Sequence, residues 1–238
     1  MVRSVIKLLA FLGNYGREYA GNRHNIAWQF LDSLPFSQSL AWQRGFSGRW
    51  ASLETGPGRV YVIKPETYMN LSGNAVAELA KFYRIEPVEV LVIHDELELA
   101  FGWYGFKSGG GLGGHNGLRS LKERLGTPDF MRLRFGIGRP AHDDIAGYVL
   151  SDFIKDERIA LECSVFPKAG AALGLLLGTN ADNDRIDGTA QAIDSGSAGL
   201  RIGVDTGKNR ETKGKPGSQA ITTFESLLKT HGKVNALA

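Results

Sequence analysis

Polar side chains suited to proton transfer and hydrogen bonding stand at four junctions along the chain, each beside an expected strand or helix. The junctions carry Asn14 with His24, Met69 with Asn70, Asp95 alone, and His115 with Asn116. Because parallel strands present their carboxyl ends at one edge of a sheet, a single sheet can bring all four junctions to one cleft. The sequence therefore predicts a shared polar site, with His24 as the first candidate for its chemistry.

The residue types at these junctions favour hydrolysis by a directly activated water. An imidazole such as that of His24 titrates near neutral pH, and a carboxylate such as that of Asp95 can orient it to take a proton from water. Asparagine side chains donate to an oxyanion or a peptide carbonyl without adding charge. The sequence shows no reactive serine motif, thiol signature or metal-ligand spacing, so attack of water on an activated ester is the simplest reaction.

A structural interpretation of the same residues stays open at this point. A single histidine at a helix start, such as His24, is more often a cap or a satisfied polar group than a catalyst. Asn70, Asn116 and Asp95 could each be caps or turn formers. His94, beside Asp95 on an apolar strand, favours a structural role.

A glycine-rich stretch, SGGGLGGHNG at residues 108–117, precedes an expected helix. It matches neither the G-x-x-x-x-G-K-[ST] phosphate loop nor a well-placed G-x-G-x-x-G, so it gives little support to a nucleotide site. Its glycines do allow backbone N–H groups to approach a ligand at a helix N-terminus. Lys107 and Arg134 could meet a phosphate nearby, although the residues alone slightly favour two solvated charges. Arg132 shares a strand face with Arg134 by the period of two.

The elements that must position these residues follow from hydrophobic periodicity. Strands are expected at residues 5–12, 45–54, 59–64, 88–94, 101–107 and 130–137, and helices at 23–32, 75–83, 118–125 and 154–177, the last interrupted at Pro167. Residues 138–147 read as a loop. The order predicts an α/β fold: a single domain with a mixed, mostly parallel twisted sheet covered by helices on both faces.

Composition bounds the domain organisation and the compartment. The chain has 238 residues, 42% of them hydrophobic, and a formal net charge of +3. We assign residues 1–189 to the α/β domain and residues 190–238 to a C-terminal extension whose polar composition predicts disorder, with one short amphipathic stretch at 221–229. No apolar run approaches a membrane span of ~20 residues, and no signal-peptide pattern is present, so we expect a cytoplasmic protein without a membrane partner. The single cysteine, Cys163, sits in an apolar helical pattern typical of a small buried hydrophobe.

Five segments together resemble the bacterial-type peptidyl-tRNA hydrolase family. They occur in the family's order and at about its spacings, and as a set they are specific. The segments are LGNYGREYAGNRHN at 12–25, KPETYMNLSGNAV at 64–76, VLVIHDELEL at 90–99, KSGGGLGGHNGLRSL at 107–121 and RLRFGIGRP at 132–140.

The resemblance implies an enzyme that cleaves the ester between a peptide and the 3′ end of tRNA, and so recycles tRNA from aborted translation. It implies His24 as the general base, Asp95 as the carboxylate that orients it, and Asn116 as the group that stabilises the transition state. The substrate-binding residues that it implies are Asn14, Tyr19, Met69, Asn70, His115, Lys107 and Arg134, the last two on the 5′ phosphate of tRNA. No metal or organic cofactor is implied, and a monomer is expected.

The chain departs from the family pattern at the first turn. Phe11 stands where the family has glycine, Tyr15 where it has proline, and Asn22 where threonine usually precedes Arg-His-Asn. None of these changes removes a proposed catalytic group. Phe11 and the extension leave open the alternative of a non-catalytic RNA-binding or splicing relative on the same fold. A third interpretation, a nucleotide-processing enzyme, rests only on the glycine-rich stretch.

Overall fold

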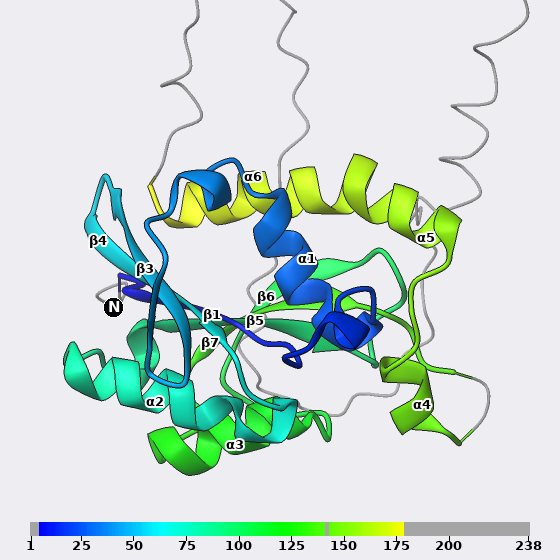
Figure 1. Cartoon of the computed structure of the whole chain (residues 1–238), viewed down its shortest axis with the longest axis horizontal. Coiled ribbons are helices and arrows are strands. Elements are labelled where there is room, and N and C mark those ends of the chain that lie inside the picture. Colours follow the sequence, from blue (N-terminus) through cyan, green and yellow to red (C-terminus); the bar gives the residue numbers. More distant parts are fainter. Residues whose placement is uncertain (1–4, 141–142, 179–238) are drawn as a thin grey trace, which may run out of the picture. The chain divides into compact units, whose positions relative to one another are not determined.

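Seven strands form one mixed sheet at the centre of the fold (Figure 1). The computed structural model describes residues 5–140 and 143–178. Across the sheet the order is β2-β3-β4-β1-β5-β7-β6. The strands are β1 (Leu8–Phe11), β2 (Gln43–Gly45), β3 (Gly48–Thr55), β4 (Gly58–Pro65), β5 (Val90–Glu96), β6 (Tyr104–Ser108) and β7 (Met131–Gly136). The expected mixed α/β sheet is confirmed, but parallel pairs do not predominate as expected, since three of the six strand pairs are parallel and three are antiparallel.

The four central strands, β4, β1, β5 and β7, run parallel, and the strands at both edges pair antiparallel. Every residue of β1 and β5 is buried, as an apolar run requires when helices cover both faces of the sheet. In register, Leu8 lies beside Tyr61 on one side and Val90 on the other. The carboxyl ends of the parallel strands therefore meet at one edge, where the predicted junctions follow.

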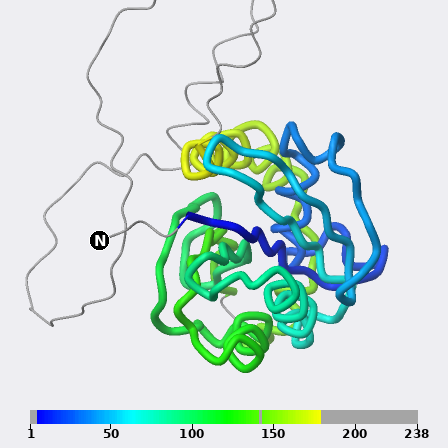
Figure 2. Tube along the Cα trace, turned by 90° about the vertical axis from the view of Figure 1, so that its left-hand side faces the viewer, coloured from blue at the N-terminus to red at the C-terminus, as the bar shows by residue number. Residues whose placement is uncertain are grey.

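Helices lie on both sides of this sheet (Figure 1). Their bounds are α1 (Ile26–Ser33), α2 (Ser72–Phe82), α3 (Asn116–Leu125), α4 (Ile145–Val149), α5 (Lys155–Ala160) and α6 (Phe166–Leu176). One core forms where α1 and α6 pack on the sheet, with Phe30 against Phe135 and Phe166. A second core lies under α2 and α3. Figure 2, turned by 90°, keeps yellow α6 and green α3 on opposite sides of the sheet.

Several sequence expectations are corrected. Pro167 does not interrupt the last helix: a π-helical turn at Leu161–Val165 precedes it, and α6 continues through it. Proline lacks a backbone N–H, and the widened turn accommodates that loss. Cys163, expected to be buried, is exposed. The expected strand at 45–54 contains the β2–β3 turn, and the expected loop at 138–147 includes the start of α4.

The expectation that no apolar run approaches a membrane span is corrected too: the helix Lys155–Leu176 is long and apolar enough to cross a membrane, judged by length and composition alone. Its buried residues include Phe166, Ala169 and Leu173, which belong to the core shared with α1. We therefore interpret it as a helix of the folded domain. The domain boundary expected at residue 189 and the amphipathic stretch at 221–229 lie outside the described residues and stay predictions.

Candidate active site

The turn that carries His24 is fastened to the turn that follows β1. Trp28 Nε1 on α1 donates to the Phe11 carbonyl at 2.9 Å. The Trp28 ring lies so close to Gly13 that a Cβ there would come within 2.7 Å, so only glycine fits. Asn25 then bonds Asn14 twice: its Oδ1 accepts from the Asn14 N–H at 2.8 Å, and its Nδ2 donates to the Asn14 carbonyl at 2.9 Å. These contacts fix the 3₁₀ turn Arg23–Asn25, and with it His24.

Phe11, the first departure from the family pattern, does not enter this site. Its side chain is fully buried and packs near Phe30 in the core under α1, with ring centroids 6.4 Å apart. Tyr15, the second departure, is 53% exposed. Neither residue lines the cavity described below. These two substitutions therefore lie outside the walls of the cavity.

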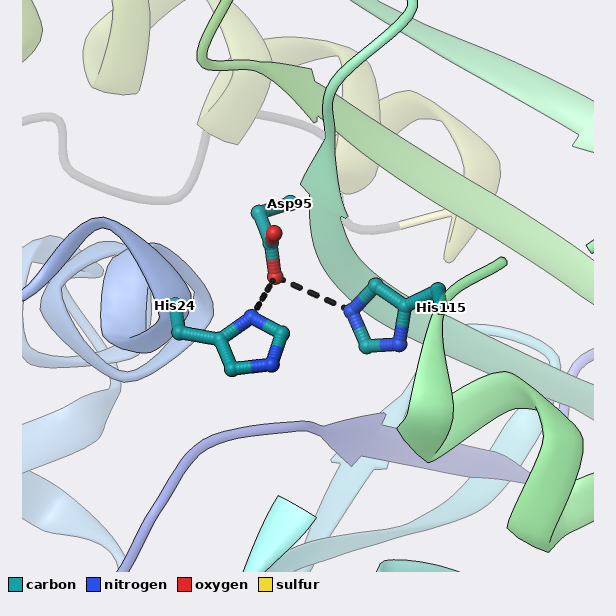
Figure 3. Close-up of side chains that lie close together, drawn as sticks. All are labelled: His24, Asp95 and His115. Carbon is teal, nitrogen blue, oxygen red and sulfur yellow. Dashed lines mark hydrogen bonds and ion pairs between the residues drawn. The ribbon is translucent and has the colours of Figure 1, made fainter. Parts of the chain in front are cut away.

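Asp95, near the end of β5, is the centre of a three-residue cluster (Figure 3). Its Oδ1 receives His24 Nδ1 at 2.8 Å and His115 Nε2 at 3.0 Å. The carboxylate is 2% exposed, so these histidines replace its water. Burial alone would raise the pKa of Asp95, but the charges and hydrogen bonds of His24 and His115 hold that pKa well below its ordinary value. Asp95 is therefore ionised at neutral pH.

The proton on His115 is placed by the start of α3. His115 is the N-cap of this helix, and its Nδ1 accepts from the backbone N–H groups of Gly117 at 3.1 Å and Leu118 at 3.3 Å. A nitrogen that accepts carries no proton, so the ring proton must be on Nε2, which donates to Asp95. The helix cap thus fixes the tautomer of His115.

His24 is held in the opposite sense, with its other nitrogen left free. The ionised Asp95 can only accept, so Nδ1 of His24 donates, and Nε2 of the neutral ring keeps its lone pair. Burial lowers the pKa of His24, but the charge of Asp95 and its hydrogen bond together raise that pKa above the ordinary value. Nε2 of His24 is therefore available as a base, and Asp95 makes it a stronger one.

The cluster has the residue types of a metal site, because its ligand atoms all lie within 4.8 Å of one another. A metal ion would need the lone pair of His115 Nε2, where the ring carries its proton. If this proton moved to Nδ1, it would point at the N–H groups of Gly117 and Leu118, which would then lose their acceptor. The donor set therefore fits a hydrogen-bonded cluster better than a resident metal.

A cavity of about 670 Å³ opens beside the cluster. Seven of the ten predicted site residues line it: Asn14, His24, Met69, Asn70, Asp95, His115 and Asn116. The side-chain Oδ1 of Asn14 accepts from the Met69 N–H at 2.8 Å, so its Nδ2 remains for a ligand. Asn70 and Asn116 are exposed at the wall, and Asn116 opens α3. The four junctions of the sequence do converge on one cleft.

A model of the family described as Peptidyl-tRNA hydrolase matches residues 8–192. The chain belongs to the peptidyl-tRNA hydrolase family. It is 50% identical over 177 residues to the peptidyl-tRNA hydrolase of Treponema pallidum, covering 72% of this chain and 85% of that one. To the enzyme of Neisseria meningitidis serogroup B it is 42% identical over 178 residues, covering 74% and 93%. The crystal structure of peptidyl-tRNA hydrolase from Acinetobacter baumannii matches with a TM-score of 0.66 and 33% identity, over 76% of this chain and 97% of that one.

Three residues implied by the resemblance to peptidyl-tRNA hydrolases lie outside the cavity lining: Tyr19, Lys107 and Arg134. Tyr19 is half-buried in the 3₁₀ turn Arg17–Tyr19. Lys107 on β6 pairs in register with Arg132 on β7, and Arg134 follows on the same face. The structure thus gathers cations at the β6–β7 edge, apart from the histidine cluster. Their roles stay predictions.

Sequence reasoning missed residues that hold this peptidyl-tRNA hydrolase site together. Asn25 fastens Asn14, as described above. Arg23 donates to Ser151 Oγ at 2.9 Å and to Glu157 at 2.7 Å, and so ties the turn of His24 to the segment after α4 and to α5. Arg132 is fully buried on β7. A signal for Arg132 was available, since an arginine inside the apolar run FMRLRFGI is unusual for a buried strand.

Proposed function

We propose that this protein hydrolyses the ester bond between the peptide and the 3′ end of tRNA in peptidyl-tRNA, and so recycles tRNA from aborted translation. Membership of the peptidyl-tRNA hydrolase family supports the activity. The observation that carries the mechanism is the bond between His24 Nδ1 and Asp95, which leaves His24 Nε2 as a base beside the cavity. The cavity and its asparagine side chains supply room and donors for a peptide ester.

In the proposed reaction, His24 Nε2 takes a proton from water as the water oxygen attacks the ester carbonyl. Asp95 stabilises the imidazolium that forms. Asn116 donates to the oxyanion, at the N-terminus of α3 where the helix dipole also favours negative charge. When the bond to the ribose 3′ oxygen breaks, His24 returns the proton to that oxygen. The products are a free peptide and a tRNA with its 3′ hydroxyl restored.

The remaining residues are assigned to substrate binding. The free Nδ2 of Asn14 and the exposed amide of Asn70 donate to peptide carbonyls, while Met69 and His115 form the wall beside them. Tyr19 is assigned to the tRNA terminus. Lys107 and Arg134 are assigned to the 5′ phosphate of the same acceptor end. We infer that the protein is soluble and acts as a monomer in the cytoplasm, where peptidyl-tRNA arises.

The alternative of a non-catalytic RNA-binding relative is not favoured by the comparisons. The matching family and the similar relatives carry the name of the hydrolase. All three proposed catalytic residues, His24, Asp95 and Asn116, are also present and line the cavity.

Release of N-acetylaminoacyl groups from charged tRNA tests the proposal. We expect turnover by the purified protein and a loss of about 10²–10⁴-fold in kcat for His24→Ala, the range associated with a general base. Asp32→Ala, an exposed substitution on α1, the helix that follows the His24 turn, is the control and should keep the wild-type rate. Full activity in His24→Ala would disprove the assigned base. Binding of tRNA without turnover by the wild type would favour the RNA-binding alternative.

A further inference from the structure

Arg132 is the largest fully buried side chain in the described part of the chain. Among residues 5–140 and 143–178, no carboxylate lies within ion-pair distance of its guanidinium. A buried charge without a paired carboxylate costs stability. The position of Arg132 therefore calls for an explanation beyond packing.

The guanidinium of Arg132 is bonded to the backbone of the glycine-rich stretch. Its Nη1 donates to the Gly111 carbonyl at 2.8 Å, and its Nη2 donates to the Gly109 carbonyl. Gly109 and Gly110 have φ angles of 59° and 81°, so the chain depends on glycine here, and the three residues 109–111 have no side chains with which to anchor themselves, whereas Leu112 packs against the core. The planar fork of an arginine can bridge two carbonyls in a way that an ammonium cannot. Arg132 thus holds the glycine loop, defined as residues 109–114, from beneath.

The glycine loop runs directly between two proposed functional elements. It follows Lys107 at the end of β6 and leads to His115 at the N-cap of α3. A Cβ built on Gly110 would lie 3.3 Å from Lys107 Cε, 3.7 Å from Lys107 Nζ and 3.8 Å from Arg132 Nη2. The ammonium of Lys107 therefore rests against the loop beside the Arg132 guanidinium. The position of the glycine loop therefore determines where the Lys107 ammonium can lie.

The same neighbourhood has surplus positive charge. Lys107 and Arg132 are directly opposite in register, and Arg134 follows Arg132 on the same face. Like charges that face each other across strands are destabilising. The buried Nε atoms of Arg132 and Arg134 have no hydrogen-bond partner among the described residues. An anion is the ligand that would relieve this arrangement.

We infer that Arg132 is a positioning residue, which holds the glycine loop so that the ammonium of Lys107 is placed to bind a phosphate. Because its side chain is fully buried, Arg132 acts through the loop and does not touch the substrate. The inference rests on the proposed assignment of Lys107 and Arg134 to the 5′ phosphate of tRNA.

The test compares binding of uncharged tRNA that carries or lacks its 5′ phosphate, at one fixed salt concentration. We expect the wild type to prefer the phosphorylated tRNA about tenfold, the usual scale of a charge-assisted contact. Arg132→Met should reduce this preference to about twofold or less, because it releases the two loop carbonyls. Arg132→Lys should remain impaired, since a point charge does not bridge both carbonyls. Full recovery in Arg132→Lys would overturn the inference, because charge alone would then suffice.

A variant that leaves the buried strand intact guards against loss of folding. Gly110→Ala adds a methyl group against Lys107 and Arg132, at a residue on the surface of the loop. Gly102→Ala is the matched control, since its φ of 84° imposes similar backbone strain while nothing lies within 4 Å of the new methyl. We expect Gly110→Ala to weaken the phosphate preference and Gly102→Ala to keep it. An unchanged preference in Gly110→Ala would overturn the inference.

Two further outcomes separate this inference from the proposed function. In a Lys107→Met background, Arg132→Met should remove no further phosphate preference, because both act through one ammonium. Additive losses would instead mean that Arg132 works independently of Lys107. Hydrolysis by a wild type that ignores the 5′ phosphate would overturn the role of Arg132 and leave the esterase standing. Phosphate preference without hydrolysis would do the reverse.

Discussion

The carboxylate of Asp95 and the guanidinium of Arg132 are both buried, on the paired strands β5 and β7, but their partners differ. Asp95 receives two histidine N–H groups on one oxygen, and the helix cap accounts for the second nitrogen of His115. Around Arg132, buried nitrogens lack partners in the described chain: the Nε atoms of Arg132 and Arg134 and the Nε2 of His94, which is paired in register with Arg134.

This difference indicates what each cluster can do before substrate arrives. The Asp95 cluster places its own protons, so its base is ready in the free protein. Among residues 5–140 and 143–178, Lys107, Arg132 and Arg134 form no ion pair with a carboxylate, and Glu96 acts on Arg132 only from beyond ion-pair distance, so an anion from outside would complete their arrangement. Under the proposed function, buried charge would serve chemistry at Asp95 and phosphate recognition beside Arg132.

Asp95→Asn should disrupt the cluster of His24, Asp95 and His115, with the largest expected effect on activity. The neutral amide removes the charge that raises the pKa of His24, while the burial that lowers this pKa remains. We expect kcat to fall about 10²–10³-fold. Because protonated His24 cannot act as a base, the acid limb of the kcat/KM profile should also move to lower pH. A pH–rate profile measures both, with Glu98→Gln at an exposed carboxylate as the control. An acid limb that stays in place would separate Asp95 from the titration of His24.

How far the sequence predicts this cluster depends on which bond is considered. The placement of His24 and Asp95 at one edge of the sheet was predictable, because parallel strands present their carboxyl ends there, but their hydrogen bond was not. The hydrogen bond from His115 to the same oxygen could not be predicted, since it depends on a tautomer that two N–H groups of α3 impose. The alternation of Arg132 and Arg134 was visible. The hydrogen bonds from Arg132 to the glycine loop were not, because they require the loop to fold back across the strand.

The fold shows the same division between periodic and contextual features. Apolar runs identified β1 and β5 and their place in the parallel part of the sheet. Pro167 misled because its effect depends on the π-helical turn before it, a feature without a periodic signature. Likewise, Cys163 lies within that turn and is exposed, which an apolar pattern alone does not specify.

His115→Asn tests how His24 and His115 share the carboxylate of Asp95. Asparagine is a good N-cap, so α3 should still form, but Asp95 loses one donor. We expect kcat to fall about tenfold, the scale of one hydrogen bond to a charged group. With one competitor gone, Asp95 should act more strongly on His24, and the acid limb should move to higher pH, opposite to Asp95→Asn. The same pH–rate profile decides it; a shift in the same direction as Asp95→Asn would contradict the divided roles.

Lys107→Met tests the cations of β6 and β7 through the dependence of tRNA binding on salt. Removal of one phosphate contact should raise KM several-fold, leave kcat near the wild-type value, and reduce the slope of log KM against log salt by about one unit. Steady-state kinetics across a salt series measure all three. Lys122→Met, an exposed substitution on α3, is the matched control. An equal slope in Lys107→Met and the wild type would remove Lys107 from the phosphate site.

The smallest expected effect concerns His94, which lies between the two clusters. Its Nδ1 donates to the Asp95 carbonyl at 2.5 Å. Burial holds the pKa of His94 well below its ordinary value, and the positive charge of Arg132 adds to this. The unfolded chain therefore takes up a proton near pH 6.5 that the folded chain refuses, so the contribution to stability is present above that pH and is lost as pH falls. The loss has a limit of about 1.4 kcal/mol per pH unit.

His94→Asn keeps a donor for the same carbonyl and removes this titration. His24, whose pKa is raised in the folded chain, contributes with the opposite sign, since its stabilisation is present at low pH and is lost as pH rises through the folded pKa. Between pH 6.5 and pH 5.5, the variant should therefore lose about 1 kcal/mol less of its free energy of unfolding than the wild type. Urea unfolding at both pH values, with pH 7.5 as the reference, measures the difference. Parallel pH curves for the two proteins would show that His94 can be protonated in place, and that the cations beside it do not keep it neutral.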